Sequence, residues 1–271
     1  MTDVLMVIGV GGMGQAIARR LGSGKTVLLA DYNEQTLASA AESLSADGHH
    51  VESQPVDVSS AESVRGLAEY AASLGNVAQV AHTAGLSPSQ APAEAILAVD
   101  LLGTALVLQE FGEVVAPGGA GVVIASMAGH MFPPLAGEQE KALAHNPPND
   151  LLQLDFISSI TDPNFAYPIA KQANHIRVRA ASAQWGRRGA RINSISPGII
   201  STPMGQQELA SPVGDGMRAM IAMSATGRQG TPDDIALATA FLLGPDASFI
   251  TGADLLVDGG VIAAVKAGSP A

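Results

Sequence analysis

Short apolar runs alternate with helical patterns along nearly the whole chain. The runs are mostly continuous in Val, Ile, Leu and Ala, which is typical of parallel strands that are covered on both faces. They predict seven strands, at residues 4–8, 26–30, 51–55, 77–82, 121–125, 191–195 and 255–257. Helical patterns lie between them, at about 12–22, 34–46, 60–74, 93–115, 165–186 and 231–243. This rhythm predicts an α/β fold, a Rossmann-like doubly wound parallel sheet with helices on both faces.

Two stretches interrupt the rhythm, and each follows a predicted strand at the edge where open α/β sheets bind ligands. Residues 130–163 contain two Pro-Pro pairs, and residues 203–228 carry Met204, Met217, Met220 and Met223. Neither stretch resembles a separate domain. We therefore predict a single domain over residues 1–271, with an insertion at about 130–163 and a substrate lid at about 203–228.

Composition and charge disfavour several classes of function. Hydrophobic residues make up 47% of the 271 residues and charged residues 14%, so general disorder is excluded. The formal net charge of −11 disfavours nucleic acids and anionic membranes as partners. The chain has no cysteine, which excludes disulfides, thiol catalysis and thiolate metal sites. The beginning of the sequence lacks the basic region of a signal peptide, and we expect no apolar run long enough to span a bilayer, hence a cytoplasmic protein.

A glycine turn follows the first predicted strand and opens the first helix. Residues 9–14 read Gly-Val-Gly-Gly-Met-Gly, the G-x-G-x-x-G spacing in the context that this motif requires. Such glycines let the backbone approach a pyrophosphate, while the helix N-terminus offers free amides. The alternative is a tight turn without a ligand. The predicted cofactor contacts are Gly9, Gly11, Gly12, Met13 and Gly14.

An aspartate follows each of the next two predicted strands. Asp31 stands where a carboxylate accepts hydrogen bonds from a ribose diol and repels a 2′-phosphate. Because no Arg or Lys follows it in the loop, NAD is favoured over NADP. Asp57 and Val58, after the third strand, are predicted to meet the adenine. For both acids the alternative is a turn residue or a helix cap.

Tyr167 and Lys171 are four residues apart, so on a helix they share one face. A nearby ammonium lowers the pKa of a phenol, which then exchanges a proton with an alcohol near neutral pH. Taken alone, such a pair is more often structural. Pro168 predicts that the helix begins just before Tyr167 or bends there.

Together with these residues, further motifs occur in an order that resembles the short-chain dehydrogenase/reductase family, over nearly the whole chain. They are Ala84-Gly85, Ser126, residues 197–204 (Pro-Gly-Ile-Ile-Ser-Thr-Pro-Met), 227–236, 251–252 and 257–260. The resemblance implies an NAD-dependent oxidoreductase that interconverts an alcohol and a carbonyl compound. It also implies a homo-oligomer, a homotetramer or, if the insertion covers one interface, a homodimer.

The resemblance also implies roles for individual residues. Tyr167 resembles the catalytic acid/base, Lys171 the residue that holds the nicotinamide ribose, and Ser126 the serine that orients the substrate oxygen. The alternative for Ser126 is a strand-end serine that bonds the backbone. The further cofactor contacts implied are Thr83, Ala84, Gly85, Pro197, Gly198, Ile200 and Thr202.

The chain departs from the family pattern at four places. The glycine segment is one residue shorter than usual, and Thr83 replaces an asparagine before Ala84-Gly85, with His82 ahead of it. Asp100 replaces the catalytic asparagine; as an anion it would compete for Lys171 and raise the pKa of Tyr167, which shifts activity to higher pH, and the alternative is that Asp100 is held protonated. The longer spacing from Ser126 to Tyr167 resembles bacterial 3α-hydroxysteroid dehydrogenase/carbonyl reductase.

His130, Met131 and Met204 are predicted to contact the substrate, together with Phe132, Pro133 and Leu135. These residues favour a lipophilic secondary alcohol or ketone. The alternatives are ordinary helix packing for the methionines and a rim position without a role for His130. We predict no metal site, because His49-His50 has no partner at usable spacing. Rival functions are a 3-ketoacyl-thioester reductase, or a catalytically weakened NAD-binding regulator, which Asp100 would favour.

Overall fold

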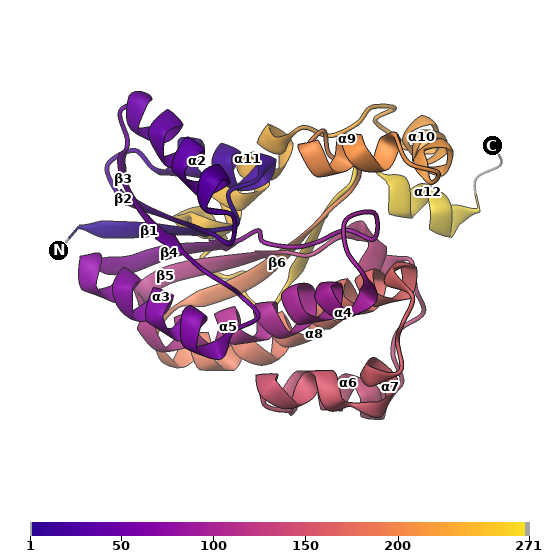
Figure 1. Cartoon of the computed structure of the whole chain (residues 1–271), viewed down its shortest axis with the longest axis horizontal. Helices are drawn as coiled ribbons and strands as arrows, with labels where there is room; N and C mark the ends of the chain where they lie inside the picture. Colours follow the sequence, from indigo (N-terminus) through magenta and orange to yellow (C-terminus); the bar gives the residue numbers. More distant parts are fainter. Residues whose placement is uncertain (1, 269–271) are drawn as a thin grey trace.

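The computed structural model describes residues 2–268, and its centre is one seven-stranded parallel sheet in the order β3-β2-β1-β4-β5-β6-β7 (Figure 1). The order reverses between β1 and β4, which is where doubly wound sheets bind ligands. The predicted fold class is confirmed, and each predicted strand is present. The strands are β1 (Asp3–Ile8), β2 (Thr26–Asp31), β3 (His50–Pro55), β4 (Asn76–His82), β5 (Val115–Ile124), β6 (Arg191–Pro197) and β7 (Asp254–Val257).

Helices cover both faces of the sheet because the strands are apolar on both sides. Alternate residues of β1 point to opposite faces: Met6 joins the apolar cluster under α3, α5 and α8, whereas Leu5 joins the cluster under α1 and α2. Figure 1 shows α2 and α11 on one side of the sheet and α3, α5 and α8 on the other. The bounds are α1 (Gly12–Leu21), α2 (Glu34–Ala46), α3 (Ala61–Leu74), α5 (Thr104–Val114), α8 (Pro163–Arg187) and α11 (Pro232–Leu243).

One helical run contradicts an expectation from the sequence. The helix α4 (Ala93–Ile96), a π-helical turn (Leu97–Gly103) and α5 follow one another without a break. This run, Ala93–Val114, has 22 residues and is long and apolar enough to cross a membrane, so the expectation that no such run exists is wrong. Because 72% of its apolar window is buried inside the fold, its apolar composition is that of a core helix.

The predicted insertion and lid are largely helical. After a 3₁₀ turn (Met127–His130), the insertion forms α6 (Gly137–His145), a second 3₁₀ turn (Pro148–Gln153) and α7 (Asp155–Ser158). Its Leu143, Leu151 and Ile157 pack with residues of α4 and α8 in a third apolar cluster. The lid forms α9 (Pro203–Leu209) and α10 (Gly214–Met223). A last 3₁₀ turn (Pro245–Ala247) precedes β7, and α12 (Val261–Ala267) follows it.

The start of α8 differs from the prediction. The helix begins at Pro163, where the Asp162 side chain caps it by accepting a hydrogen bond from the Asn164 N–H (2.8 Å). Pro168 therefore lies inside the helix, where it removes one backbone donor. A proline at the first helical position is favourable because its missing N–H has no partner there, which accounts for the earlier start.

Candidate active site

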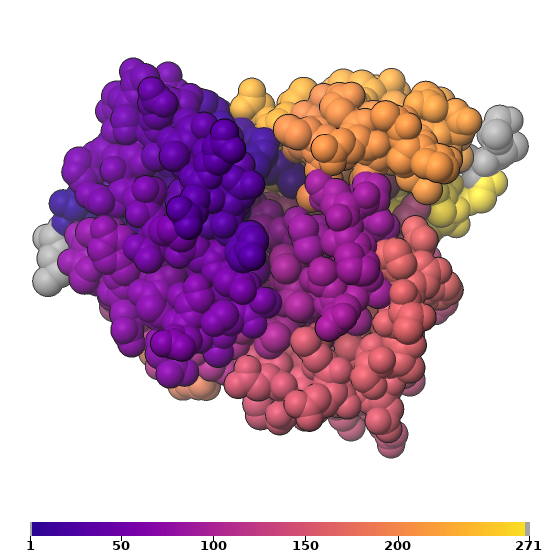
Figure 2. Space-filling view, in the orientation of Figure 1, coloured from indigo at the N-terminus to yellow at the C-terminus, as the bar shows by residue number. Residues whose placement is uncertain are grey.

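A cleft of about 590 Å³ opens at the carboxyl ends of β1, β2 and β4. In Figure 2 it lies where the indigo N-terminal part, the magenta segment and the orange α9 meet. The structure brings most of the predicted cofactor contacts together there. Those that line the cleft are Gly9, Gly11, Gly12, Met13, Gly14, Asp31, Asp57, Val58, Thr83, Ala84, Gly85 and Thr202.

The glycine turn forms a cradle beside this cleft. Gly9 has a φ of +90°, and a Cβ atom there would collide with the backbone of Ala84. A Cβ atom on Gly14 would collide with the carbonyl oxygen of Gly9, so both glycines are needed for the turn itself. A Cβ atom on Gly11 would meet nothing within 4 Å. The space over Gly11, in front of the N-terminus of α1, fits the pyrophosphate of a dinucleotide.

The two acids face the same cleft. One Asp31 oxygen accepts a hydrogen bond from the Val10 N–H (2.8 Å), and the other accepts from the Asn33 N–H (2.9 Å). Asn33, and not Asp31, caps α2. One Asp57 oxygen accepts from the N–H and the hydroxyl of Ser59, while the side chain of Ser60 caps α3. The carboxylates are thus fixed at the cleft wall and are not the caps of these helices.

Tyr167, Lys171 and Asp100 meet behind Gly85. The Lys171 Nζ lies 3.1 Å from Asp100 Oδ2 and 5.5 Å from the centre of the Tyr167 ring. Lys171 also donates to the Ile124 carbonyl (3.4 Å), and Asp100 Oδ1 accepts from the Leu86 N–H (2.8 Å). A Cβ atom on Gly85 would lie 3.2 Å from the Lys171 Nζ, so this glycine keeps the wall thin between the ion pair and the cleft.

The charges of this cluster set the proton affinity of the phenol. Burial raises the pKa of Tyr167, Lys171 lowers it and Asp100 raises it; the result lies above the ordinary value. Lys171 lowers the pKa of the phenol and Asp100 raises it, as expected, but burial outweighs the ammonium. Burial lowers the pKa of Lys171, but Asp100 and Tyr167 raise it more. Burial raises the pKa of Asp100 against the opposing effect of Lys171.

The contacts of Ser126 fit both interpretations of its role, as a residue that bonds the backbone and as a residue of the catalytic cluster. Its hydroxyl oxygen accepts a hydrogen bond from the Ala128 N–H (3.1 Å) and caps the 3₁₀ turn that follows β5. The same hydroxyl interacts with Tyr167 and lowers the pKa of the phenol. Since a hydroxyl both donates and accepts, this position serves the backbone and the cluster together.

The residues that depart from the family pattern have defined partners. The Thr83 hydroxyl donates to the Gly9 carbonyl (2.6 Å) and so ties β4 to the glycine turn. The His82 Nε2 lies 3.2 Å from the Thr104 hydroxyl, which donates to the Asp100 carbonyl (2.9 Å). Burial and Lys171 lower the pKa of His82 to about 3, so its imidazole is neutral at ordinary pH.

Several predicted contacts lie away from the cleft. His130 and Met131 line a different groove between the 3₁₀ turn, α8 and β7, outside the cleft of the predicted cofactor contacts, and their contact with substrate stays a prediction. The chain turns sharply at Gly129 against α8 and carries both side chains to that side. Gly198 and Ile200 line a separate cavity of about 210 Å³ beside Asp258. Pro197 ends β6, opposite Val257 of β7.

Several residues at the site, unlike Met204, were not predicted from the sequence. Met204 lines the cleft as predicted, together with Tyr32, Leu86, Gln90, Ala98 and Val99. The charge of Glu208, on α9, raises the pKa of Tyr167. Burial raises the pKa of Glu208 itself. Nothing in the local sequence around Glu208 distinguishes it from a surface glutamate, and the packing of α9 over the cleft places it here.

The chain resembles proteins of known activity over its whole length. A family model described as short chain dehydrogenase matches residues 3–137, and one described as enoyl-(acyl carrier protein) reductase matches residues 138–262. The chain is 43% identical to the short-chain dehydrogenase/reductase bsc3 of Alternaria brassicicola, with 96% of each chain covered. It is 31% identical to the D-threitol dehydrogenase of Mycolicibacterium smegmatis, covering 92% of this chain and 88% of the relative.

Two further similarities are partial or distant. The 3-alpha-hydroxysteroid dehydrogenase/carbonyl reductase of Comamonas testosteroni is 36% identical over 104 residues, 38% of this chain and 40% of the relative. Among solved structures, a short-chain type dehydrogenase/reductase from Mycobacterium ulcerans superposes with a TM-score of 0.76 at 23% identity, covering 97% of this chain and 90% of that one. This second similarity bears on the fold alone.

Proposed function

The chain belongs to the short-chain dehydrogenase/reductase family and is an oxidoreductase acting on CH–OH groups, and from this premise we propose that it interconverts a lipophilic secondary alcohol and its ketone with NAD. The observation that carries the proposal is the cluster of Tyr167, Lys171 and Asp100 behind Gly85, a residue that lines the same cleft as the glycine turn. Its substrate is a small molecule, as for its relatives.

The family binds a nicotinamide cofactor, which supplies or accepts the hydride when bound. The space over Gly11 and the N-terminus of α1 supports binding of the pyrophosphate there. Asp31 supports the preference for NAD, because its fixed carboxylate stands at the end of β2 and the loop after it continues with Tyr32, Asn33 and Glu34, none of them basic. A 2′-phosphate at this place would be repelled.

Tyr167 handles the proton in this proposal. In alcohol oxidation its phenolate accepts the hydroxyl proton, and in ketone reduction its phenol returns a proton to the carbonyl oxygen. Lys171 stabilises the phenolate, and the Ser126 hydroxyl donates to the substrate oxygen as negative charge develops on it. Asp100 holds the ammonium in place but disfavours the phenolate, which places the oxidation optimum on the alkaline side.

The lipophilic substrate class is supported by the apolar side chains at the cleft, Leu86, Ala98, Val99 and Met204. The acyl-thioester ketone reductase is less well supported, since Asp31 opposes NADPH. A regulator that has lost catalysis is favoured by one feature, the carboxylate of Asp100 on Lys171. The presence of Ser126, Tyr167 and Lys171 together opposes it, because the hydroxyl and the phenol are the groups that the catalytic steps require.

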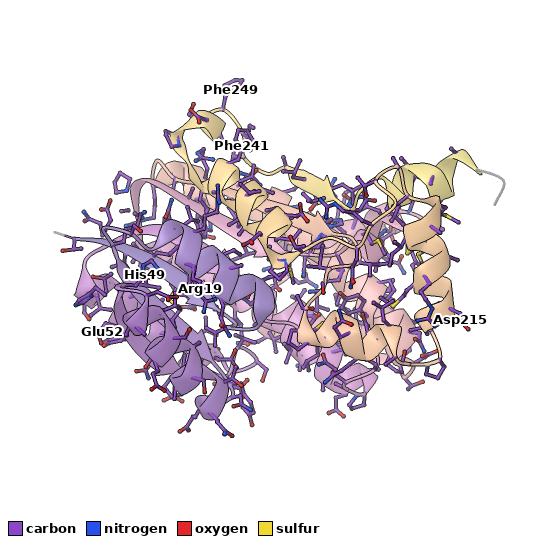
Figure 3. All side chains as sticks on the ribbon, turned by 90° about the horizontal axis from the view of Figure 1, so that it is seen from above. Arg19, His49, Glu52, Asp215, Phe241 and Phe249 are labelled. Atoms are coloured by element: carbon purple, nitrogen blue, oxygen red, sulfur yellow. The ribbon has the colours of Figure 1, made fainter. Side chains whose placement is uncertain are left out.

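The proposal extends to the assembly. We propose one domain over residues 1–271, cytoplasmic and homo-oligomeric. Support for assembly comes from large apolar side chains that remain exposed on α11, β7 and the turn between them. Figure 3 shows Phe241 and Phe249 projecting from one edge of the molecule. The exposed side chains there are Leu237, Phe241, Phe249 and Leu255. Since α6 packs on α8, a dimer through this edge is favoured over a tetramer that also pairs through α8.

The test is turnover by the purified chain, followed as NADH oxidation and NAD⁺ reduction. The panel contains cyclic and steroidal ketones with their alcohols, short polyols with their ketoses, and a 3-ketoacyl thioester, each with NADH and with NADPH. We expect turnover of the lipophilic ketones with NADH. Preference for polyols would overturn the substrate class, and preference for the thioester with NADPH would support the rival enzyme. NADH binding without turnover of any compound would support the regulator.

A further inference from the structure

Three side chains far apart in the sequence converge on the side of the molecule that the active site does not use. His130 ends the 3₁₀ turn after β5, His175 lies on α8 and Asp254 begins β7. Each offers one ligand atom, and these atoms all lie within 4.8 Å of one another. They line a groove of about 590 Å³ that is separate from the cofactor cleft.

The two imidazoles aim the same ring nitrogen at the same carboxylate. The His130 Nε2 lies 2.8 Å from Asp254 Oδ2, and the His175 Nε2 lies 3.5 Å from Asp254 Oδ1. The two rings are 4.7 Å apart between centres. The side chains of His130, His175 and Asp254 keep 25%, 13% and 14% of their surface exposed. The group is therefore largely buried yet open to a small solute from the groove.

The surroundings hold the carboxylate in a fixed orientation. The hydroxyls of Ser194 and Ser196, both on β6, donate to Asp254 Oδ1 at 2.6 and 3.0 Å. Hydrogen bonds of this kind orient the ligands in metal sites. The second carboxylate oxygen, Oδ2, faces the His130 Nε2 at 2.8 Å, and the His175 Nε2 lies 2.8 Å from the Ser196 hydroxyl; an ion would replace these two contacts.

We propose that His130, His175 and Asp254 bind one divalent transition-metal ion of the zinc class, with the fourth position open to the groove. Two imidazole nitrogens and one carboxylate oxygen form a donor set typical of zinc sites with an open position. Mg²⁺ and Ca²⁺ are disfavoured, because these ions prefer oxygen ligands throughout. In a tetrahedral site with bonds of about 2.0–2.2 Å the ligand atoms lie about 3.3–3.6 Å from one another, so the His130 Nε2 and Asp254 Oδ2, now 2.8 Å apart, would separate slightly to admit the ion.

At this position an ion would hold the 3₁₀ turn, α8 and β7 together. His130 follows Ser126 by four residues, and His175 follows Lys171 by four residues on the same face of α8. A Cβ atom on Gly129 would lie 2.8 Å from the His175 ring, so the 3₁₀ turn already rests on the helix. An ion at this place would join the turn, α8 and the edge strand β7. It would stabilise the fold and fix the distance between Ser126 and Tyr167 without touching substrate.

The sequence predicts no metal site at these residues, and no short motif links residues 130, 175 and 254. The separations of 45 and 79 residues exclude recognition by spacing, and parallel β6 and β7 bring the ligands together only in the folded chain. The inference is independent of the proposed function, since it concerns binding and not turnover.

The experiment uses the full chain without a histidine tag, freed of metals by a chelator. Zn²⁺ binding is measured by calorimetry, and Co²⁺ serves as the spectroscopic probe. We expect one Zn²⁺ per chain with a Kd of about 1 µM or tighter. The visible spectrum of the Co²⁺ form should have the strong absorption of a four- or five-coordinate site. Saturating Zn²⁺ should raise the Tm, because an ion that binds the folded chain stabilises it.

Variants locate the ion. His175→Gln and Asp254→Asn should each weaken Zn²⁺ binding at least tenfold and abolish the rise in Tm. The matched control is His145→Gln, an exposed histidine on α6 outside this group. It should bind as the wild type does. Binding that is equally strong in all variants, or a weak octahedral Co²⁺ spectrum in the wild type, would overturn the proposal. The spectrum decides the matter even if a variant fails to fold.

Discussion

The buried ion pair of Asp100 and Lys171 determines the charge around the phenol of Tyr167. The ammonium lies between a carboxylate at 3.1 Å and the tyrosine ring at 5.5 Å, so its stabilising effect is divided between the two. The sequence indicates that Asp100 occupies the place of an asparagine. It does not indicate the net effect on the phenol, because that depends on how deeply the cluster is buried.

Asp100→Asn should shift the pH profile of alcohol oxidation to lower pH by on the order of one unit. The phenolate is the active form in oxidation, so activity is present above the pKa of Tyr167 and is lost below it. The Asp100 charge raises this pKa, and a neutral amide that still accepts from the Leu86 N–H removes that effect. The measurement is kcat against pH.

Glu208→Gln is the matched control for this profile. Glu208 also raises the pKa of Tyr167, but it is the weakest of the charged contributors. Its removal should move the profile in the same direction by less. A profile of Asp100→Asn that stays in place or moves to higher pH would contradict the electrostatic account.

Asp31→Ser should shift the cofactor preference toward NADP(H). Loss of the carboxylate removes repulsion of a 2′-phosphate and a hydrogen-bond acceptor for the ribose diol. We expect the ratio of kcat/KM with NADPH to that with NADH to rise at least tenfold, which corresponds to about 1.4 kcal/mol. Asp57→Asn should leave the ratio unchanged. An unchanged ratio in Asp31→Ser would place the ribose elsewhere.

At the scale of elements, the sheet is predictable because its strands are continuous apolar runs bounded by turns. The glycine turn, Asp31 and Thr83 then follow from the ends of β1, β2 and β4. β5 begins at Val115, six residues before the predicted start. The sequence pattern misses these residues because Pro117 and Gly118 interrupt the apolar run. The helices of the insertion are too short to show a recognisable hydrophobic periodicity. The π-helical turn around Asp100 has no sequence signal.

Gly14→Ala and Gly11→Ala, both in the glycine turn after β1, separate the effect of this turn on folding from its effect on cofactor binding. A Cβ atom on Gly14 collides with the Gly9 carbonyl, so this variant should lose about 1–3 kcal/mol of unfolding free energy. A Cβ atom on Gly11 meets no protein atom within 4 Å, and its φ of −67° suits alanine. Gly11→Ala should therefore keep its stability within about 0.5 kcal/mol.

The same two variants are compared for NADH binding by fluorescence. Gly11→Ala should weaken binding at least tenfold although it folds normally, because its methyl group fills the space assigned to the pyrophosphate. Unchanged affinity in this variant would show that the cofactor does not approach the turn.

At the scale of the whole molecule, the residues that the sequence cannot assign are those brought together by packing alone. The charge of Glu208 on α9 raises the pKa of Tyr167 on α8, and Asp254 of β7 meets His175 of α8, although these residues are far apart in the sequence. The position of His130 outside the cofactor cleft is not predictable from the sequence, because proximity to Ser126 in the chain does not reveal the turn at Gly129.

The edge formed by α11, β7 and the turn between them should be a subunit interface. We expect the wild type to have the mass of a dimer by light scattering. Phe249→Ser combined with Phe241→Ser should shift it to a monomer, because these side chains, 102% and 44% exposed, would be the apolar centre of the contact. Val213→Ser, an equally exposed apolar residue at the start of α10, is the control. A monomeric wild type would contradict this arrangement.

The role of Tyr167 as the general acid and base is tested by Tyr167→Phe, measured for NADH affinity and for turnover of the best ketone in the same preparation. Removing one hydroxyl oxygen leaves the ring, the helix and the cleft in place. The account predicts an NADH Kd within about twofold of the wild type and a kcat lower by about 10²–10⁴-fold, the range for loss of a general acid. A kcat that stays within about threefold, with NADH bound as in the wild type, would mean that the proton passes through another group.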